Sequence, residues 1–290
     1  MTTSCTRGLD IGFASLDYLQ IGILGVFQGI TELLPISSTA HMRIIPAVLG
    51  WTDPGSAFSA AMQLAALAAV LSYFWRDVRK VLNGSTAAIR QRNFQDPSFR
   101  LAIGILVATL PIGLAGMALS SLLNSCNSPL RGLMVIGFSS IVMAILMGIS
   151  ELTCTHQRRV EDMRLRDALI VGLAQVGALI PGVSRSGSTL TGALFLNFRR
   201  EEAAQFSFLI GLPAIALAGL KELWVLYHAS ISPAAWSHLL FGLLVASVSA
   251  FAAIWGLMKF LERFSTWPFV AYRASLGVFL IVAVSVGWLN

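Results

Sequence analysis

The stretch Gly25–Met42 reads GVFQGITELLPISSTAHM, and the interpretation of the whole chain starts from it. It places a carboxylate, two adjacent hydroxyls and an imidazole inside a region whose flanks are apolar enough for a lipid bilayer. These side chains belong to Glu32, Ser37, Ser38 and His41. Ionisable side chains at membrane depth are energetically costly, so they are candidates for function.

A second stretch, Gly172–Asn197, reads GLAQVGALIPGVSRSGSTLTGALFLN and supplies a cation, Arg185. Each stretch has an apolar segment, a break at a proline and a short second segment, with Pro35 in the first break and Pro181 in the second. Proline lacks an amide donor, and the hydroxyl residues after it favour caps and turns. We therefore predict two broken helix hairpins, each of which enters and leaves a membrane by one face.

The composition indicates an integral membrane protein. Of the 290 residues, 56% are hydrophobic and 12% are charged, and the mean hydropathy is +0.76. A soluble domain carries roughly 25% charged residues. Six apolar runs are long enough to cross a hydrocarbon core of about 30 Å. They are residues 57–75, 100–120, 131–150, 203–226, 238–259 and 272–289.

The basic residues predict the orientation of the chain. The net charge is +6, but Lys and Arg gather in short loops between apolar runs, which is the pattern of the positive-inside rule and not of a nucleic-acid-binding surface. They lie in 76–100, in 151–167, at Arg199 and Arg200, and at Lys259, Arg263 and Arg273. The segments 121–130 and 227–237 carry no Lys, Arg, Asp or Glu. We expect the basic loops in the cytoplasm, both termini outside, and the first hairpin to open outward.

The order of these elements predicts an inverted repeat. Residues 16–150, with the hairpin 16–50, form one half, and residues 167–289, with the hairpin 167–197, form the other. Each half has three spans, and this odd number inverts the second half relative to the first. The expected fold is an all-α polytopic membrane protein with an inverted-topology repeat, six spanning helices plus two re-entrant helix hairpins, in one domain of residues 1–290.

Short sequence matches support the repeat. The pentapeptide GILVA at 104–108 is similar to GLLVA at 242–246 in the corresponding span of the other half. Inverted repeats usually place the binding site near the midplane of the membrane, where broken helices from the two halves face each other. We therefore expect the two hairpins to meet, with a phosphate between them.

Glu32 and Gln28 are one helical turn apart and share a face. A carboxylate without an adjacent cation at membrane depth must be protonated, paired or bound to a metal. We predict a divalent cation, Mg²⁺ or Ca²⁺, held by Glu32 with the carbonyl oxygen of Gln28 assisting. The alternative is that both side chains only satisfy the backbone of the broken hairpin.

Ser38 and His41 are three residues apart, so they share a face at the start of a helix. Two catalytic roles stay open. His41 takes the proton of the Ser38 hydroxyl and so activates a serine nucleophile, or His41 attacks phosphorus itself. Ser37 and Thr39 either cap the helix or add hydroxyl donors to a bound phosphate.

The bend PGVSRSGST at residues 181–189 predicts a phosphate site. Its glycines and serines expose backbone amides and hydroxyls around a planar cation, at the start of a short helix. The expected phosphate contacts are Arg185, Ser184, Ser186 and Gly187. The alternative, that Arg185 reaches a membrane interface, is weak because the bend lies within an apolar hairpin.

Together the two motifs resemble those of the undecaprenyl-pyrophosphate phosphatase family, the bacitracin-resistance type of bacterial membrane phosphatase. The motifs are QGITELLPISSTAH at 28–41 and PGVSRSG at 181–187, and the similarity extends over the span pattern of essentially the whole chain. Gln28 stands where this family more commonly has Glu, which removes one charge from the metal site. Ala40 stands where many members have Gly, which should matter little.

The resemblance implies hydrolysis of undecaprenyl pyrophosphate to undecaprenyl phosphate and inorganic phosphate, a reaction that recycles the lipid carrier for cell-wall synthesis. It also implies a divalent cation and a site at the outer face of the bacterial cytoplasmic membrane. We expect Ser38, His41, Glu32 and Arg185 to be catalytic. A polyprenyl-lipid flippase or ion-coupled transporter is the alternative, because carriers with alternating access use the same architecture. The sequence leaves the oligomeric state open, a homodimer included.

Overall fold

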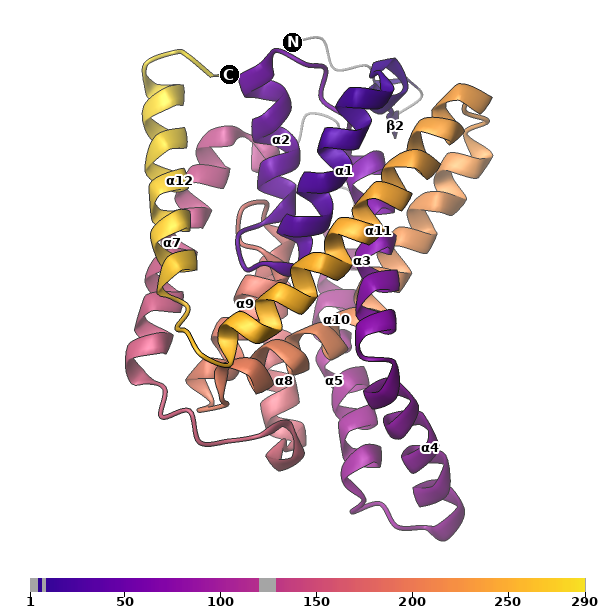
Figure 1. Ribbon diagram of the computed structural model, residues 1–290, viewed down its shortest axis with the longest axis vertical. Helices are drawn as coiled ribbons and strands as arrows, with labels where there is room; N and C mark the ends of the chain where they lie inside the picture. The colour runs from indigo at the N-terminus through magenta and orange to yellow at the C-terminus, as the bar shows by residue number, and fades with distance from the viewer. Residues whose placement is uncertain (1–4, 7–8, 120–128, 290) are drawn as a thin grey trace.

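Six long helices form the body of the protein (Figure 1). The computed structural model describes residues 5–6, 9–119 and 129–289. The long helices are α3 (Ser56–Tyr73), α5 (Pro97–Ala118), α7 (Leu133–Thr153), α10 (Arg200–His228), α11 (Pro233–Leu261) and α12 (Trp267–Ser285). All six are long and apolar enough to cross a membrane, which confirms the predicted multi-pass helical fold. Most of the predicted outer segment 121–130 lies outside the described residues.

Two pairs of shorter helices lie among the long ones. The first pair is α1 (Tyr18–Leu33) with α2 (Ser38–Leu49), and the second is α8 (Leu165–Val176) with α9 (Arg185–Phe195). In Figure 1 the first pair extends from the upper end of the bundle and the second from the lower end, and the turns of both pairs lie in the middle. Their positions in the chain match the predicted hairpins. Whether each hairpin re-enters a bilayer stays a prediction.

The remaining elements are short, apart from α4. They are β1 (Cys5–Thr6), β2 (Leu9–Asp10), η1 (Gly12–Ser15), α4 (Trp75–Gln91), η2 (Pro129–Arg131), η3 (Val160–Asp162) and η4 (Gly177–Leu179). The strands β1 and β2 pair with each other. The sequence interpretation treats 76–100 as a loop, whereas α4 forms a helix that packs against α5. Its apolar residues, such as the buried Val81 and Ala88, are too few to stand out as a span.

Both hairpin turns end in the same backbone conformation. Ser37, which precedes α2, has φ 73° and ψ 100°, and Ser184, which precedes α9, has φ 72° and ψ 124°. A side-chain-bearing residue rarely adopts a positive φ, and residues held this way concentrate at functional sites. Consequently Ser38 and Arg185 are equivalent in position, because each is the first residue of its short helix.

The repeated pentapeptides provide the surfaces on which the hairpins pack. Helix α1 packs on α11 and α8 packs on α5, so each hairpin contacts a span of the opposite half. A Cβ atom at Gly29 would overlap the carbonyl oxygen of Ala246, and one at Gly172 would lie 2.5 Å from that of Ala108. Ala108 and Ala246 are the last residues of GILVA and GLLVA. The two halves are thus packed on each other in a crossed arrangement, which supports the predicted repeat.

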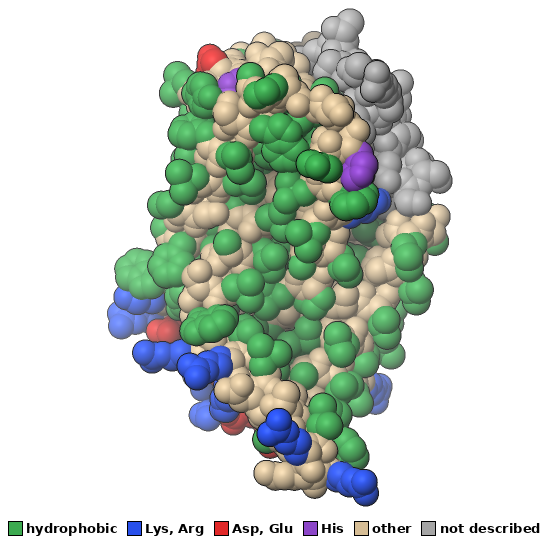
Figure 2. Space-filling view, turned by 90° about the vertical axis from the view of Figure 1, so that its right-hand side faces the viewer, with side chains coloured by type: hydrophobic (Ala, Val, Ile, Leu, Met, Phe, Trp, Pro, Cys, Tyr) green, Lys and Arg blue, Asp and Glu red, His purple; other side chains and the backbone are tan. Residues whose placement is uncertain are grey.

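Most Lys and Arg side chains lie at one end of the bundle. On the face in Figure 2, Lys and Arg lie mostly at the lower end, and apolar side chains cover the middle. At this end Glu151 of α7 accepts hydrogen bonds from Arg200 Nε at 2.7 Å and from Thr266 Oγ1 at 2.8 Å, and so links α7, α10 and the start of α12. Asp167 pairs with Arg158 at 2.5 Å. The apolar band with one basic end is the pattern of the positive-inside rule.

Candidate active site

The turns of the two hairpins contact each other in the middle of the bundle. Ser186 Oγ of α9 lies 3.3 Å from the carbonyl oxygen of Glu32 and 3.1 Å from that of Leu34. Arg185 Nη2 lies 3.4 Å from Glu32 Oε1. These contacts join residues more than 150 positions apart, so the structure brings the two stretches of the sequence together.

Glu32 is the centre of this contact. Its side chain is buried, and its Oε2 atom accepts a hydrogen bond of 2.5 Å from Ser38 Oγ and one of 3.1 Å from Gln28 Nε2. Its Oε1 atom faces Arg185. A buried carboxylate is costly unless it is hydrogen-bonded or paired, and here both oxygens have partners. The carboxylate therefore lies between the hydroxyl of Ser38 and the guanidinium of Arg185.

His41 does not bond to Ser38, which differs from the pairing proposed from the sequence. Its Nδ1 atom lies 2.7 Å from the carbonyl oxygen of Ser37, and its Nε2 atom lies 2.6 Å from the hydroxyl of Tyr272. The three-residue spacing puts both side chains on one helix face, but Ser38 turns toward the end of α1 and the imidazole turns back toward the turn. His41 therefore positions the carbonyl group of the strained Ser37.

The position of Arg273 differs from the prediction, which places this residue in a cytoplasmic loop. It lies within α12, its exposed fraction is 0%, and it reaches both hairpin turns. Its Nη1 atom donates to the carbonyl oxygen of Pro35 at 2.9 Å, and its Nη2 atom donates to those of Gly182 at 2.6 Å and Val183 at 2.9 Å. The guanidinium thus holds the two turns together through their main chains.

The sequence analysis predicts no role for Tyr272 or Arg273, because it begins the last apolar run at residue 272. The helix begins five residues earlier, at Trp267. An arginine flanked on both sides by apolar helical residues was the signal available in the sequence, since a cation at that depth is a functional candidate.

The predicted phosphate-binding residues divide into two groups. Ser186 bonds to main-chain carbonyls, and Gly187 donates its amide to Ser184 Oγ at 3.1 Å, with Arg273 Nη1 3.3 Å from where a Cβ would stand. Ser186 and Gly187 therefore stabilise the contact between the two hairpin turns. The residues that line a cavity are Ser37, Thr39, Ser184 and Arg185.

This cavity has a volume of about 180 Å³. Its polar lining also includes Glu32, Ser38 and Gln63, the last of which was not predicted. Its apolar lining is Ile112, Ala178, Leu179, Ala214, Ile215 and Ala218. Arg185 Nη1 is buried and has no hydrogen-bond partner. A buried guanidinium donor without such a partner is a candidate for binding an anion.

The oxygen atoms beside Glu32 fit a hard divalent cation. Gln28 Oε1 is buried without a hydrogen-bond partner, one helical turn from the Glu32 carboxylate. The described residues contain no cluster of three or more His, Cys, Asp and Glu side chains that could hold a metal. Mg²⁺ commonly uses one or two protein oxygens together with phosphate oxygens and water, and this donor set suits that mode.

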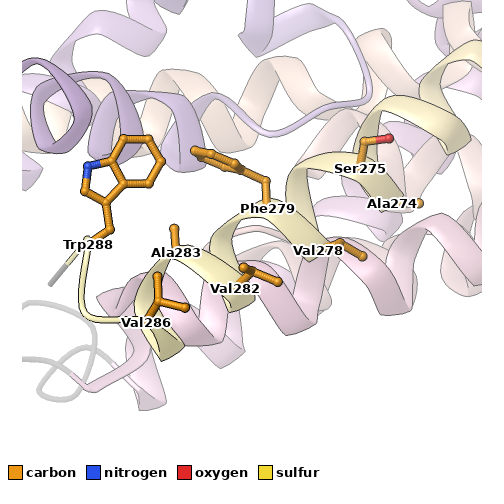
Figure 3. A pocket seen from close by; sticks show the side chains of 8 residues that line it. All are labelled: Ala274, Ser275, Val278, Phe279, Val282, Ala283, Val286 and Trp288. Atoms are coloured by element: carbon orange, nitrogen blue, oxygen red, sulfur yellow. The ribbon is translucent and has the colours of Figure 1, made fainter.

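A wider depression lies on α12 and is shown in Figure 3. Its volume is about 650 Å³, and its lining is Ala274, Ser275, Val278, Phe279, Val282, Ala283, Val286 and Trp288. None of these side chains is ionisable in the physiological range. The depression belongs to the apolar outer surface. The polar and ionisable side chains of the candidate site line the smaller cavity between the hairpins.

Comparisons with known proteins show which family the sequence matches. The sequence profile of the family described as bacitracin resistance protein BacA matches residues 21–279. Undecaprenyl-diphosphatase 2 of Mesorhizobium japonicum is 66% identical over 262 residues, which cover 90% of this chain and 99% of that relative. The undecaprenyl-diphosphatase of Gloeobacter violaceus is 48% identical over 93% of this chain and 94% of its own. That of Trichormus variabilis is 46% identical over 96% of this chain and 88% of its own.

Proposed function

The chain belongs to the bacitracin resistance protein BacA family, and on that premise we propose that it is an undecaprenyl-diphosphate phosphatase. It hydrolyses undecaprenyl pyrophosphate to undecaprenyl phosphate and inorganic phosphate. The observation that carries this proposal is the buried contact of Ser38, Glu32 and Arg185 at one cavity, since it joins a hydroxyl nucleophile, a proton acceptor and an anion-binding cation.

Arg185 binds the diphosphate. Its Nη1 donor has no hydrogen-bond partner among the described residues, and its Nη2 atom lies 3.4 Å from Glu32, a distance beyond the usual range for an N–H···O bond. Phosphate oxygens that replace the Glu32 contact would accept two parallel hydrogen bonds. As charge redistributes on the terminal phosphate during transfer, the fixed guanidinium stabilises it.

Ser38 is the nucleophile, and Glu32 is its base. The hydroxyl oxygen attacks the terminal phosphorus, its proton passes to Glu32 Oε2 along the 2.5 Å hydrogen bond, and the bond from phosphorus to the bridging oxygen breaks. Undecaprenyl phosphate is the leaving group. Water then hydrolyses the phosphoserine and releases inorganic phosphate. Direct attack by His41 is less favoured, because Ser37 and Tyr272 occupy its two ring nitrogens.

Glu32 and Gln28 are the residues that would hold a divalent cation. The unpartnered Oε1 atom of Gln28 and the carboxylate oxygens of Glu32 support this assignment. A cation there would neutralise charge on the diphosphate.

The cavity walls and the charges support a position for the lipid tail and an orientation in the membrane. Ile112 of α5 with Ala214 and Ile215 of α10 form an apolar wall that suits the first isoprene units. The basic end of the bundle is cytoplasmic by the positive-inside rule. In Figure 1 the first hairpin extends from the end of the bundle opposite the α4 and α5 connection, and this supports a site that faces the outer side of the cytoplasmic membrane.

The test is phosphate release from a polyprenyl diphosphate by detergent-purified protein, with and without a chelator. We expect release by the wild-type protein that a chelator suppresses and Mg²⁺ or Ca²⁺ restores. Absence of release at any cation concentration, together with uptake or transbilayer movement of the lipid, would replace the phosphatase with a transporter.

A further inference from the structure

The strained turn before α2 lacks a support that the matching turn before α9 has. Ser37 and Ser184 share a positive φ, at 73° and 72°. The side chain of Ser184 accepts a cap hydrogen bond from the amide of Gly187, and its carbonyl oxygen accepts one of 2.9 Å from the amide of Ser188. Among the described residues, the side chain of Ser37 makes no such cap bond, and the equivalent amide bond, from His41, is 3.4 Å long. A strained backbone persists only where its surroundings hold it, so Ser37 needs another partner.

The imidazole of His41 supplies that partner. Its Nδ1 atom lies 2.7 Å from the carbonyl oxygen of Ser37, closer than the amide of the same residue. A carbonyl oxygen can only accept, so Nδ1 carries the proton of this bond. The corresponding position in the second hairpin is Ser188, whose hydroxyl instead donates to the carbonyl oxygen of Arg185 at 3.0 Å. Of the two hairpins, the one that carries Ser38 therefore has an imidazole that holds the strained carbonyl group.

The hydroxyl of Tyr272 determines which ring nitrogen of His41 carries that proton. It lies 2.6 Å from Nε2, and the two rings stack with an interplanar angle of 12°. His41 is buried and both of its hydrogen-bond partners are uncharged, so the neutral imidazole fits this environment, because a buried unpaired charge is costly. In this form Nε2 has no proton and accepts from the hydroxyl of Tyr272. An Nε2 atom that accepts a hydrogen bond keeps the proton on Nδ1.

Helix α12 gives Tyr272 a fixed position relative to the first turn. The next residue, Arg273, donates to the carbonyl oxygen of Pro35 at 2.9 Å. The helix itself packs along α7. Two adjacent residues of α12 therefore contact the first hairpin at Pro35 and at His41, and Ser37 lies between these two points in the chain.

We propose that Tyr272 is a positioning residue for the nucleophile. Its hydroxyl keeps the proton of His41 on Nδ1, and His41 then holds the carbonyl group of Ser37. Because Ser38 is the next residue, its hydroxyl stays beside the carboxylate of Glu32. Tyr272 acts through His41 and takes no part in proton or phosphoryl transfer. This inference rests on the proposed function, since it takes Ser38 as the nucleophile.

The first experiment removes only the hydroxyl, in Tyr272→Phe. Phenylalanine keeps the ring that stacks on His41, and the position is half-exposed, so the melting temperature in detergent should stay that of the wild-type protein. Loss of one positioning hydrogen bond should lower kcat for phosphate release about ten-fold, because a small displacement of a reacting group is costly. KM should not change, because Arg185 still binds the phosphate. Tyr227→Phe, the same change at an exposed tyrosine of α10, is the matched control.

The second experiment tests whether Tyr272 acts through His41. Asparagine places an amide donor near the position of Nδ1 and has no atom at the position of Nε2, so His41→Asn can bond Ser37 without Tyr272. In the His41→Asn protein, Tyr272→Phe should therefore cost no further activity, which a double-mutant cycle measures. Nitrogen NMR of labelled protein reports the tautomer directly. Wild-type His41 should give well-separated signals from a protonated Nδ1 and a bare Nε2, and in Tyr272→Phe these signals should move toward each other as the ring exchanges between tautomers.

Three outcomes would overturn the positioning role. They are a wild-type kcat in Tyr272→Phe, an equal loss from Tyr272→Phe in the wild-type and His41→Asn backgrounds, and a melting temperature that falls together with kcat. If His41→Asn does not fold, the nitrogen signals decide, and an unchanged pair of His41 signals in Tyr272→Phe overturns the proposal. A wild-type protein that releases no phosphate would contradict the proposed function instead, and the same signals would still show whether Tyr272 sets the tautomer of His41.

Discussion

Ser38 Oγ lies 2.5 Å from Glu32 Oε2, and this hydrogen bond joins the first residue of α2 to the last turn of α1. The hairpin break at Pro35 makes the contact geometrically feasible, because the chain reverses between the two residues. The bond gives the hydroxyl a proton acceptor from its own hairpin. The second hairpin contributes Arg185 on the other side of the same carboxylate.

Replacing either partner of this bond should abolish catalysis. We expect Ser38→Ala and Glu32→Gln to lower the rate of phosphate release by at least about 10³-fold, the scale seen when a nucleophile or its base is removed. Ser37→Ala, which changes the neighbouring hydroxyl, should cost far less. Phosphoprotein trapping with labelled substrate should place the label on residue 38. Label on His41 would contradict the assignment of Ser38.

Removing the guanidinium of Arg185 should slow turnover by at least about 10²-fold, the scale for loss of one charge-stabilising donor. Arg185→Lys should recover only part of the rate, because a lysine cannot offer two parallel donors. The measurement is steady-state phosphate release, with the exposed Arg90→Ala as control. Near wild-type release from Arg185→Ala would end the proposed role of this residue.

The membrane fold could be predicted in large part from the sequence, because hydropathy alone locates long apolar helices. The six spans and the two proline breaks required no knowledge of packing. The positions of Glu32, Ser38 and Arg185 near one point also followed, since broken hairpins of inverted halves meet at the midplane. The inverted repeat itself stays a proposal, supported by the matched conformations of Ser37 and Ser184.

Side-chain directions could not be predicted. Helical spacing put Ser38 and His41 on one face, but which neighbour each bonds depends on contacts from other elements. The partner of His41, Tyr272, comes from α12, more than 200 positions later. The partners of Arg273 could not be predicted for the same reason, because they are main-chain carbonyl groups of two distant turns and no sequence pattern marks such an acceptor.

Arg273 should matter for stability as well as for activity. Arg273→Gln leaves the carbonyls of Pro35, Gly182 and Val183 without their donor, and each unpaired buried acceptor costs about 1–3 kcal/mol. We expect a lower melting temperature in detergent together with a lower turnover rate. Arg263→Gln, at an exposed position after α11, is the control. An unchanged melting temperature would show that the contact between the two hairpin turns is stable without Arg273.

The divalent cation concentration that the activity requires should change when Gln28 is replaced. Gln28→Glu adds a second carboxylate beside Glu32, so half-maximal activity should require a divalent cation concentration about ten-fold lower, because affinity rises with ligand charge. Gln20→Glu, in the first turn of the same helix, is the control, since Glu serves the capping box there as Gln does. If the two variants show the same cation requirement, Gln28 is not a ligand.

The close packing of each hairpin on a span of the other half should depend on a glycine at the contact, such as Gly172. At Gly172 a Cβ would lie 2.5 Å from the carbonyl oxygen of Ala108 and 2.6 Å from its Cα, both of which belong to main chain and cannot turn aside. Gly172→Ala therefore has to push α8 away from α5, and overpacking of this kind costs about 1–3 kcal/mol. Because α8 and α9 carry Arg185 to the site, the melting temperature in detergent and the turnover rate should fall together.

Gly256→Ala supplies the matched comparison for this prediction. It makes the same change inside α11, five residues before the end of the helix, where a Cβ meets no atom within 4 Å, and alanine is the better helix former. Its melting temperature should equal or exceed that of the wild-type protein. If Gly172→Ala is as stable and as active as Gly256→Ala, the contact between α8 and α5 does not set the position of the second hairpin, and the crossed packing of the two halves loses its role in holding Arg185 against Glu32.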